Sequence, residues 1–378
     1  MRMRIAEKDK FKKIEEFLSG FWRYNLGSKF HQLTPRSLMI NLTYKCNSRC
    51  VMCNIWQIKP KNEVNLDQWC EIMKDNVFRD IRNLTISGGE PMLYQNFVSA
   101  VKLFIDSMPK LRRLVLNTNG FLPKQIEEEV IKIAKYCQLK KIRLVVNVSI
   151  DGVAAVQDAL RRIKNGFNKS FETVRRITKI SVKYDISVGV SSLILRQNVK
   201  RYAEMKSWLL KNRVNGGFQI VGFHKDFLKN KEKEGNLSID SSVKSDFLKV
   251  LVDIRNSKKS FSLTRYYWQD MIEMYKNSSW RTTPCSFLKD DFVIDSLGDV
   301  YYCLSVRPIG NFIKENRSIG EIYFDQKNIS FRRNLPEVAC KNCNSGCNVT
   351  SGIAFDAKRY IWYKLTGRLW PGKMLDVG

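Results

Sequence analysis

The chain has 378 residues, 44% of them hydrophobic, which suffices to bury the core of one large α/β domain and a smaller second one. No apolar run approaches the roughly 18 residues that span a bilayer, and the first ten residues lack the apolar region of a signal peptide, so we expect a cytoplasmic protein. The formal net charge is +28, but the lysines are spread along every predicted helix. This distribution favours a solvated basic surface over a nucleic-acid interface.

The predicted elements alternate between strands and helices over most of the chain. Helical spacing of Phe11, Ile14, Leu18 and Phe21 first predicts a helix within residues 1–37. Strands are then predicted at 38–42, 84–87, 114–117, 142–150, 186–193 and 218–223, and helices at 66–78, 97–107, 123–136, 171–184 and 199–212. Alternation of this kind predicts parallel strands joined by right-handed crossovers.

The second half of the chain divides by composition. Residues 225–284 form a lysine-rich linker with helices, 285–350 carry most of the remaining cysteines, and 351–378 form a basic and aromatic tail. The tail is compatible with contact to an anionic membrane surface, although docking onto the rest of the protein is the commoner use of a terminal helix. A turn around Gly298 predicts a hairpin.

Three cysteines occupy the loop after the first predicted strand. Cys46, Cys50 and Cys53 have the spacing C-x3-C-x2-C. A [4Fe-4S] cluster normally takes four cysteines, so three of them leave one iron open to a small molecule. The alternative is a zinc knuckle, but zinc usually takes four ligands and no fourth lies close by in the sequence. The spacing therefore predicts a cluster with one open iron.

Together with Met52 and Trp56, this loop resembles the signature of the radical S-adenosylmethionine (radical SAM) enzymes. The stretch Gly88-Gly89-Glu90-Pro91, after the second strand, is similar to the GGEP motif of that family. The resemblance implies that Glu90 and the neighbouring backbone hold the methionyl ammonium of S-adenosylmethionine. It also implies an α/β fold, with a partial (β/α)6 barrel over residues 38–224 and a small cysteine-rich α+β extension.

Polar side chains end the later strands of the predicted barrel. Alternation along the fourth strand places Asn147, Ser149 and Asp151 on one face, opposite apolar neighbours, which predicts a polar inner face. The resemblance places the segment Ser149 to Gly152 near the ribose of S-adenosylmethionine and makes Arg161 a candidate for its carboxylate, with an exposed helix arginine as the alternative. The candidate cofactor-binding residues are Gly88, Gly89, Glu90, Asn117, Asn119, Ser149 and Arg161.

A second group of cysteines lies in residues 285–350. Cys285 and Cys303 flank the predicted hairpin, and Cys340, Cys343 and Cys347 follow as C-x2-C-x3-C. This pattern resembles the SPASM/Twitch extension, which carries auxiliary iron-sulfur clusters. Cys285, Cys303, Cys340 and Cys343 match its one-cluster form best, while Cys347 either replaces one of them or remains a thiol. A zinc ribbon is the alternative.

The catalytic base of some family members does not carry over. In sulfatase-maturing relatives the second cysteine of the extension is followed by an acidic base, whereas Cys303 is followed by Leu304. The residues that could replace it are Asp151, Tyr302 and His224, and we take Asp151 and His224 as the candidate catalytic residues. His224 ends the predicted strand 218–223, where it either faces the cavity or is a satisfied core histidine.

The resemblance implies a catalytic [4Fe-4S] cluster, S-adenosylmethionine, an auxiliary [4Fe-4S] cluster and an electron donor such as flavodoxin or ferredoxin. Reductive cleavage of S-adenosylmethionine would give a 5′-deoxyadenosyl radical that abstracts hydrogen from a substrate. We expect first an oxidoreductase that dehydrogenates a small polar molecule such as a sugar or aminocyclitol. A ribosomal-peptide maturase is second, because the segment before Cys46 is too short for the usual leader-binding domain. A non-catalytic iron-sulfur or zinc protein that binds nucleic acid is third.

Overall fold

The computed structural model describes residues 20, 22–27, 32–259, 262–346 and 357–369. The chain divides into two compact units. The barrel unit comprises residues 35–247 and 291–329, and the helical unit comprises residues 1–34, 248–290 and 330–378. The helix predicted around Phe11 to Phe21 lies outside the described residues. Over the described part of the chain, every helix is too short or too polar to cross a bilayer.

The barrel unit is built on one sheet of nine strands in the order β6-β5-β4-β3-β2-β1-β7-β8-β9. The strands are β1 Ser37–Asn41, β2 Asn83–Ser87, β3 Arg113–Thr118, β4 Arg143–Ser149, β5 Ile186–Ile194, β6 Gly216–Ile220, β7 Asp291–Asp295, β8 Asp299–Tyr301 and β9 Gly310–Asn311. Strands β1 to β6 are all parallel to their neighbours, as their alternation with helices predicts. The order confirms the expected partial barrel.

Strand β7 pairs in parallel with β1, so that Leu38 lies opposite Phe292 and Asn41 opposite Asp295. Strands β8 and β9 continue the sheet with antiparallel pairing. Gly298 has a φ of +88° in the turn between β7 and β8, which confirms the predicted hairpin. Residues 291–329 therefore belong to the barrel unit, and the predicted domain boundary at 285 does not separate them from it.

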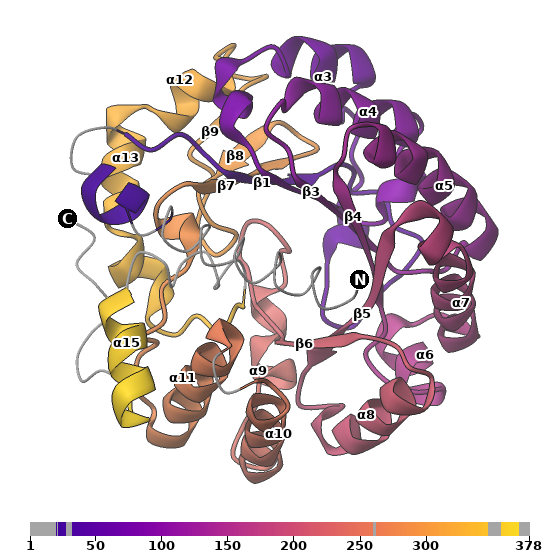
Figure 1. The fold of residues 1–378 in the computed structure, drawn as a ribbon, viewed down its shortest axis with the longest axis vertical. Helices are drawn as coiled ribbons and strands as arrows, with labels where there is room; N and C mark the ends of the chain where they lie inside the picture. The colour runs from indigo at the N-terminus through magenta and orange to yellow at the C-terminus, as the bar shows by residue number, and fades with distance from the viewer. Residues whose placement is uncertain (1–19, 21, 28–31, 260–261, 347–356, 370–378) are drawn as a thin grey trace, which may run out of the picture. The chain divides into compact units, whose positions relative to one another are not determined.

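Helices α3, α4, α5, α7 and α8 lie along the outer face of the sheet of the barrel unit (Figure 1). The helices of this unit are α3 Leu66–Ile72, α4 Phe97–Ser107, α5 Pro123–Leu139, α6 Ala155–Arg161, α7 Gly166–Tyr184, α8 Tyr202–Lys211, α9 Glu234–Leu237 and α12 Ile319–Tyr323. Asn65 caps α3 in a capping box with Gln68. The helix predicted at 66–78 is too long, because the Asp75 carboxylate accepts from Val77 N and starts a separate 3-10 turn there.

The alternation predicted along β4 is present in the structure. Leu144, Val146 and Val148 are fully buried, and Val148 packs with Val174 of α7 and with side chains of α8. The intervening Asn147 and Ser149 are half-buried on the opposite face. The inner face of the sheet is therefore polar at this level, as the sequence predicts.

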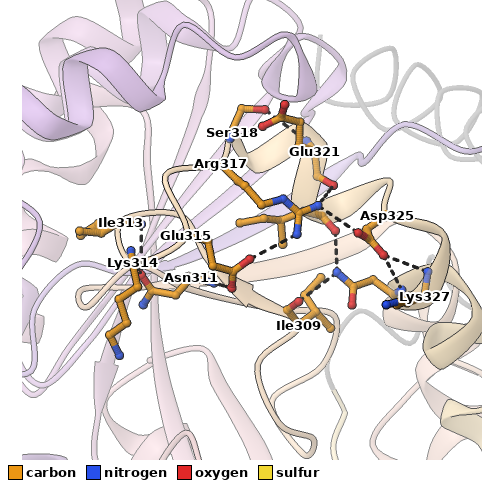
Figure 2. Close-up of polar contacts among 12 residues, drawn as sticks. Ile309, Asn311, Ile313, Lys314, Glu315, Arg317, Ser318, Glu321, Asp325 and Lys327 are labelled. Carbon is orange, nitrogen blue, oxygen red and sulfur yellow. Dashed lines mark hydrogen bonds and ion pairs between the residues drawn. The ribbon is translucent and has the colours of Figure 1, made fainter.

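The segment after β9 is held by polar contacts between neighbouring side chains (Figure 2). Arg317 pairs with Glu315 at 3.3 Å and with Asp325 at 3.0 Å. Ser318 and Glu321 form a capping box that begins α12. These contacts fix the chain that follows Cys303 and its hairpin.

The described helical unit contains four α-helices or parts of them. They are α11 Leu263–Asn277, α15 Ala357–Thr366 and parts of α10 Lys244–Asn256 and α13 Gln326–Arg333, which continue into the barrel unit. The tail helix α15 packs on α11, where the rings of Tyr363 and Tyr266 lie 5.0 Å apart. Ile361 and Leu365 on α15 are exposed.

Candidate functional site

The cysteine loop follows β1, at the carboxyl end of a central strand. Cys50 is buried, Cys46 and Cys53 are half-buried, and none of the three is in a disulfide. The Sγ of Cys46 accepts from Ser48 N, and the Sγ of Cys53 accepts from Ile55 N at 3.5 Å. Such N–H···S contacts stabilise cysteine sulfurs that bind iron.

Burial raises the pKa of Cys46 to about 12 and that of Cys53 to about 11. Thiols in this state become thiolates when a metal compensates the charge. Among the described residues, no three His, Cys, Asp or Glu side chains are grouped closely enough to share one metal ion. A cubane does not require such a group, because each of its cysteines binds a different iron. The three thiols of Cys46, Cys50 and Cys53 are the donor set expected for a [4Fe-4S] cluster with one open iron.

Cys50 lies against the end of helix α6. Ser48 Oγ is 3.1 Å from Cys50 Sγ and donates to the carbonyl oxygen of Arg161 at 2.8 Å. The Nη1 of Arg161 donates to Cys50 Sγ at 3.8 Å, and Val51 N donates to Leu160 O. The cysteine loop is therefore held to α6 by both backbone and side chains.

Gly88 and Gly89 lie against the backbone that leads into the cysteine loop. Gly89 N donates to Thr43 O at 2.7 Å, and Glu90 N donates to Lys45 O at 2.8 Å. A Cβ at Gly89 would lie 2.3 Å from Lys45 O, and one at Gly88 would lie 2.5 Å from Thr43 O. The glycines thus permit a close approach between the turn after β2 and the backbone at Thr43 and Lys45. The motif alone does not indicate this packing role.

Glu90 is completely buried. Its Oε1 accepts from Thr118 Oγ1 at 2.8 Å and its Oε2 from Asn119 N at 2.7 Å. Burial raises the pKa of Glu90 to about 7, although these hydrogen bonds oppose the shift. The carboxyl group thus joins the ends of β2 and β3 directly behind the glycine turn.

The candidate asparagines have different surroundings. Asn119 is buried, and its Nδ2 donates to Asn47 Oδ1 of the cysteine loop at 2.6 Å. Asn117 is half-buried and accepts from Asn147 Nδ2 at 3.1 Å. Asn119 therefore supports the loop, whereas Asn117, Asn147 and Ser149 remain on the polar inner face.

Asp151 and Arg161 form a buried ion pair with an N–O distance of 2.6 Å. The other carboxylate oxygen of Asp151 accepts from Leu193 N at 2.8 Å. Burial lowers the pKa of Arg161, but the charges of Asp151 and Cys50 outweigh this effect and raise it above its ordinary value. Arg161 is therefore not the exposed helix arginine of the alternative, because its guanidinium joins Asp151 to Cys50.

His224 is buried next to the hairpin that carries Cys303. Its Nδ1 lies 2.7 Å from the carbonyl oxygen of Leu304. A carbonyl oxygen only accepts, so Nδ1 carries the proton and Nε2 has the lone pair. No described residue is hydrogen-bonded to Nε2. Burial lowers the pKa of His224, and the nearby charge of Lys231 adds to this shift.

Cys303 follows β8 in the barrel unit, where its Sγ accepts from Ser305 N at 3.4 Å. Cys285, Cys340 and Cys343 belong to the helical unit, and Cys347 lies outside the described residues. The Nη1 of Arg281 is 3.3 Å from Cys343 Sγ. The contact pattern of Cys303 repeats that of Cys46 and Cys53, which fits a thiolate that binds iron.

Two features of the site were not predicted. The hydroxyls of Tyr44 and Tyr301 donate to the same oxygen of Asp295, at 2.7 and 3.1 Å, and all three residues are buried. Tyr44 and Tyr301 each stand two residues before a cysteine, which is the one signal that the sequence offers. Arg281 is the second feature, and no pattern distinguishes it from the other basic residues.

Comparison with known proteins gives two family matches. The radical SAM superfamily matches residues 40–209, and the SPASM iron-sulfur cluster-binding domain matches residues 285–344. These families bind a catalytic [4Fe-4S] cluster with S-adenosylmethionine and auxiliary iron-sulfur clusters, respectively. The matches cover the three cysteines of the loop after β1 and four of the second group, Cys285, Cys303, Cys340 and Cys343.

Similar proteins include the sporulation killing factor maturation protein SkfB of Bacillus subtilis, 21% identical over 80% of this chain and 73% of SkfB. A probable GTP 3′,8-cyclase of Archaeoglobus fulgidus is 27% identical over 39% of this chain, which spans about half of the cyclase. These relatives do not support the sugar or aminocyclitol dehydrogenase that we expect first from the sequence.

Solved structures share the fold. Streptococcus suis SuiB bound to S-adenosylmethionine has a TM-score of 0.57 and 15% identity, over 85% of this chain and 75% of SuiB. The enzyme anSMEcpe with bound AdoMet and the Cp18Cys peptide has a TM-score of 0.54 and 17% identity, over 88% of this chain and all of that one. The chain belongs to the radical SAM superfamily and carries a SPASM iron-sulfur extension.

Proposed function

We propose that this protein is a peptide maturase that removes two hydrogens from a residue of its substrate. The observation that carries this proposal is the extent of the similarity to SkfB. It covers 320 residues, 80% of the chain, and is therefore too long to be confined to the barrel match at 40–209. The probable GTP 3′,8-cyclase of Archaeoglobus fulgidus matches over 39% of the chain and the GTP 3′,8-cyclase of Nautilia profundicola over 61%. The similarity to a maturation protein thus spans more of the chain than these similarities to cyclases.

The polar inner face of the barrel is suited to a peptide. Its amide and hydroxyl side chains, including Asn117, Asn147 and Ser149, offer donors and acceptors that match peptide groups. SuiB has been solved with the precursor peptide SuiA and has a TM-score of 0.55 to this chain.

When bound, the catalytic cluster and S-adenosylmethionine supply a 5′-deoxyadenosyl radical that takes one hydrogen atom from the substrate. Removing a second hydrogen requires that a proton and an electron also leave. His224 is the proton acceptor in this proposal, because its Nδ1 is committed to Leu304 and its Nε2 is unprotonated near neutral pH. An auxiliary iron-sulfur cluster, which cysteines of the SPASM match such as Cys303 and Cys343 would hold, would accept this electron. A flavodoxin or ferredoxin would supply the electron that starts the reaction.

The other candidate bases are engaged elsewhere. Both carboxylate oxygens of Asp151 have partners, in Arg161 and in Leu193 N. Tyr302 is fully buried, and its hydroxyl donates to the carbonyl oxygen of Tyr323. Asp151 is therefore assigned a positioning role in the proposal.

The proposed function is tested with candidate precursor peptides encoded beside the gene. The reconstituted enzyme, S-adenosylmethionine and dithionite are expected to yield a peptide lighter by two hydrogens and one equivalent of 5′-deoxyadenosine, both measured by mass spectrometry. Sugars and aminocyclitols are assayed in parallel. Oxidation of one of these, with every peptide unchanged, would refute the maturase assignment.

The variant His224→Gln tests the base within the same assay. Loss of a general base lowers product formation by roughly 10²-fold or more, while 5′-deoxyadenosine formation continues. With saturating S-adenosylmethionine, product formation by the unmodified enzyme is expected to be constant above neutral pH and to fall in more acidic buffer as His224 becomes protonated, because the pKa of His224 is lowered. Equal peptide oxidation by both enzymes would remove His224 from the mechanism.

Glu90→Gln is expected to weaken S-adenosylmethionine binding by roughly ten- to a hundredfold, the effect of losing one charge-assisted hydrogen bond. With its pKa near 7, Glu90 gains charge as the pH rises, so the affinity of the unmodified protein is expected to increase between pH 6 and 8. The variant should lack this rise. Calorimetric titration measures both effects.

Glu128→Gln, on the exposed side of α5, is the matched control and should bind as the unmodified protein does. The iron content is measured in each variant, because Glu90 also supports the turn beside the cysteine loop. Equal affinity and equal pH dependence in Glu90→Gln would limit Glu90 to that supporting role.

A further inference from the structure

Arg281 occupies a buried position among the cysteines of the helical unit, with 2% of its surface exposed. Its Nη1 donates to Cys343 Sγ at 3.3 Å and to Ser345 O at 2.8 Å. Its Nε donates to Thr283 O at 2.7 Å. Further contacts join Nε to Thr283 Oγ1 and Nη1 to Cys343 O, both at 3.3 Å. These hydrogen bonds fix the plane of the guanidinium against a cysteine that the SPASM match includes.

The remaining nitrogen of this guanidinium, Nη2, is buried and has no hydrogen-bond partner among the described residues. A buried donor without a partner is unfavourable, and the group that satisfies it in the loaded protein has to accept a hydrogen bond. The thiolates and inorganic sulfides of an iron-sulfur cluster are such acceptors. Arg281 therefore has the geometry of a donor to a cluster at these cysteines.

The charge of Arg281 is also uncompensated by a direct ion pair within the described part of the chain. A nearby carboxylate, Asp270, accepts instead from the backbone and hydroxyl groups of Thr282 and Thr283. A full positive charge is thus held next to Cys343 without a paired carboxylate.

The catalytic cysteine loop differs in this respect. There Arg161 contacts Cys50, but its charge is paired with Asp151 at 2.6 Å. Positive charge and hydrogen bonds to sulfur stabilise the reduced form of a cluster, which carries one more negative charge. The two arginines should therefore affect their clusters unequally.

We propose that Arg281 donates hydrogen bonds to the auxiliary cluster and raises its reduction potential, so that this cluster accepts the electron left on the substrate. Arg281 is a positioning and tuning residue in this scheme, since it does not touch the substrate. The electron-accepting role rests on the proposed function. The effect on the potential does not, because it is measured without substrate.

The test is a redox titration of the full-length, anaerobically reconstituted protein, followed by electron paramagnetic resonance. Arg281→Gln is expected to lower the equilibrium constant for reducing the auxiliary cluster at least tenfold, which is a fall of 59 mV for one electron. The catalytic cluster should keep its potential. Arg333→Gln, an exposed arginine on α13, is the matched control and should change neither.

An unchanged potential in a fully loaded Arg281→Gln protein would overturn the proposal. If this variant loses its auxiliary iron, Arg281→Lys is titrated instead, because it keeps the charge but not the planar fork of donors. The equilibrium constant for reducing the auxiliary cluster should then fall, but by less than tenfold. A reduction potential equal to that of the unmodified protein would overturn the proposal. A shifted potential in an enzyme that oxidises no peptide would refute the proposed function alone.

Discussion

Replacing Cys46, Cys50 and Cys53 together by alanine is expected to abolish the formation of 5′-deoxyadenosine from S-adenosylmethionine and dithionite. The three cysteines are the ones in the loop after β1, and their sulfurs already have the N–H donors that iron-bound thiolates accept. Without them the catalytic cluster has no ligands, and no side chain of the protein can replace its chemistry. The product is measured by chromatography after anaerobic reconstitution.

Iron content and a control variant show whether the loss of cleavage comes from loss of the catalytic cluster. Iron content should fall from about eight to about four per chain, the value for one remaining cubane. Cys70→Ala, at a half-buried cysteine on α3, is the matched control and should retain full cleavage. Undiminished cleavage by the triple variant would show that the cluster is held elsewhere. Zinc together with only four irons in the unmodified protein would instead favour a zinc ribbon in the extension.

Removing the carboxylate of Asp151 is expected to cost about 3–5 kcal/mol of folding stability, because it leaves the Arg161 guanidinium buried without its partner. The Asp151 side chain is completely buried and that of Arg161 is 11% exposed, so water cannot compensate the charge. For a unit of this size the melting temperature should fall on the order of 10 °C. Thermal unfolding of Asp151→Ala by circular dichroism measures this effect.

A double variant separates the ion pair from other effects of Asp151. Asp151→Ala combined with Arg161→Met removes both charges, and it should recover much of the lost stability. If the double variant is as unstable as Asp151→Ala, the cost comes from the hydrogen bond to Leu193 rather than from the unpaired arginine. If Asp151 were instead a catalytic base, Asp151→Ala would lose activity and keep nearly normal stability.

The sequence predicts the barrel well, because each β/α pair has its own local pattern. Alternation along β4 identifies Leu144, Val146 and Val148 as core, and the structure buries all three. The same local signals miss helix α6, Ala155–Arg161, and extend the helix at 66–78 too far. Both errors arise where a side chain or a short turn, rather than periodicity, decides the backbone.

Partners that are distant in the sequence could not be predicted for the site residues. The motif places Gly89 near the cofactor, but the contact that requires glycine is with the backbone of Lys45. Asp151 and Arg161 were assigned separate roles, although they form one ion pair. Arg281 resembles any other arginine until the fold brings it next to Cys343. Each of these depends on tertiary contacts, which composition and spacing do not encode.

Asp295 accepts hydrogen bonds from both Tyr44 and Tyr301, and its strand β7 pairs with β1 along its whole length. The two family segments therefore do not behave as exchangeable modules. A chain cut before residue 285 would leave β1 as an unpaired sheet edge, which favours aggregation, and would remove the partner of the Tyr44 hydroxyl. Chimeras between members of this family should keep residues 291–329 with the barrel, and evolution is expected to have changed the two sides of this contact together.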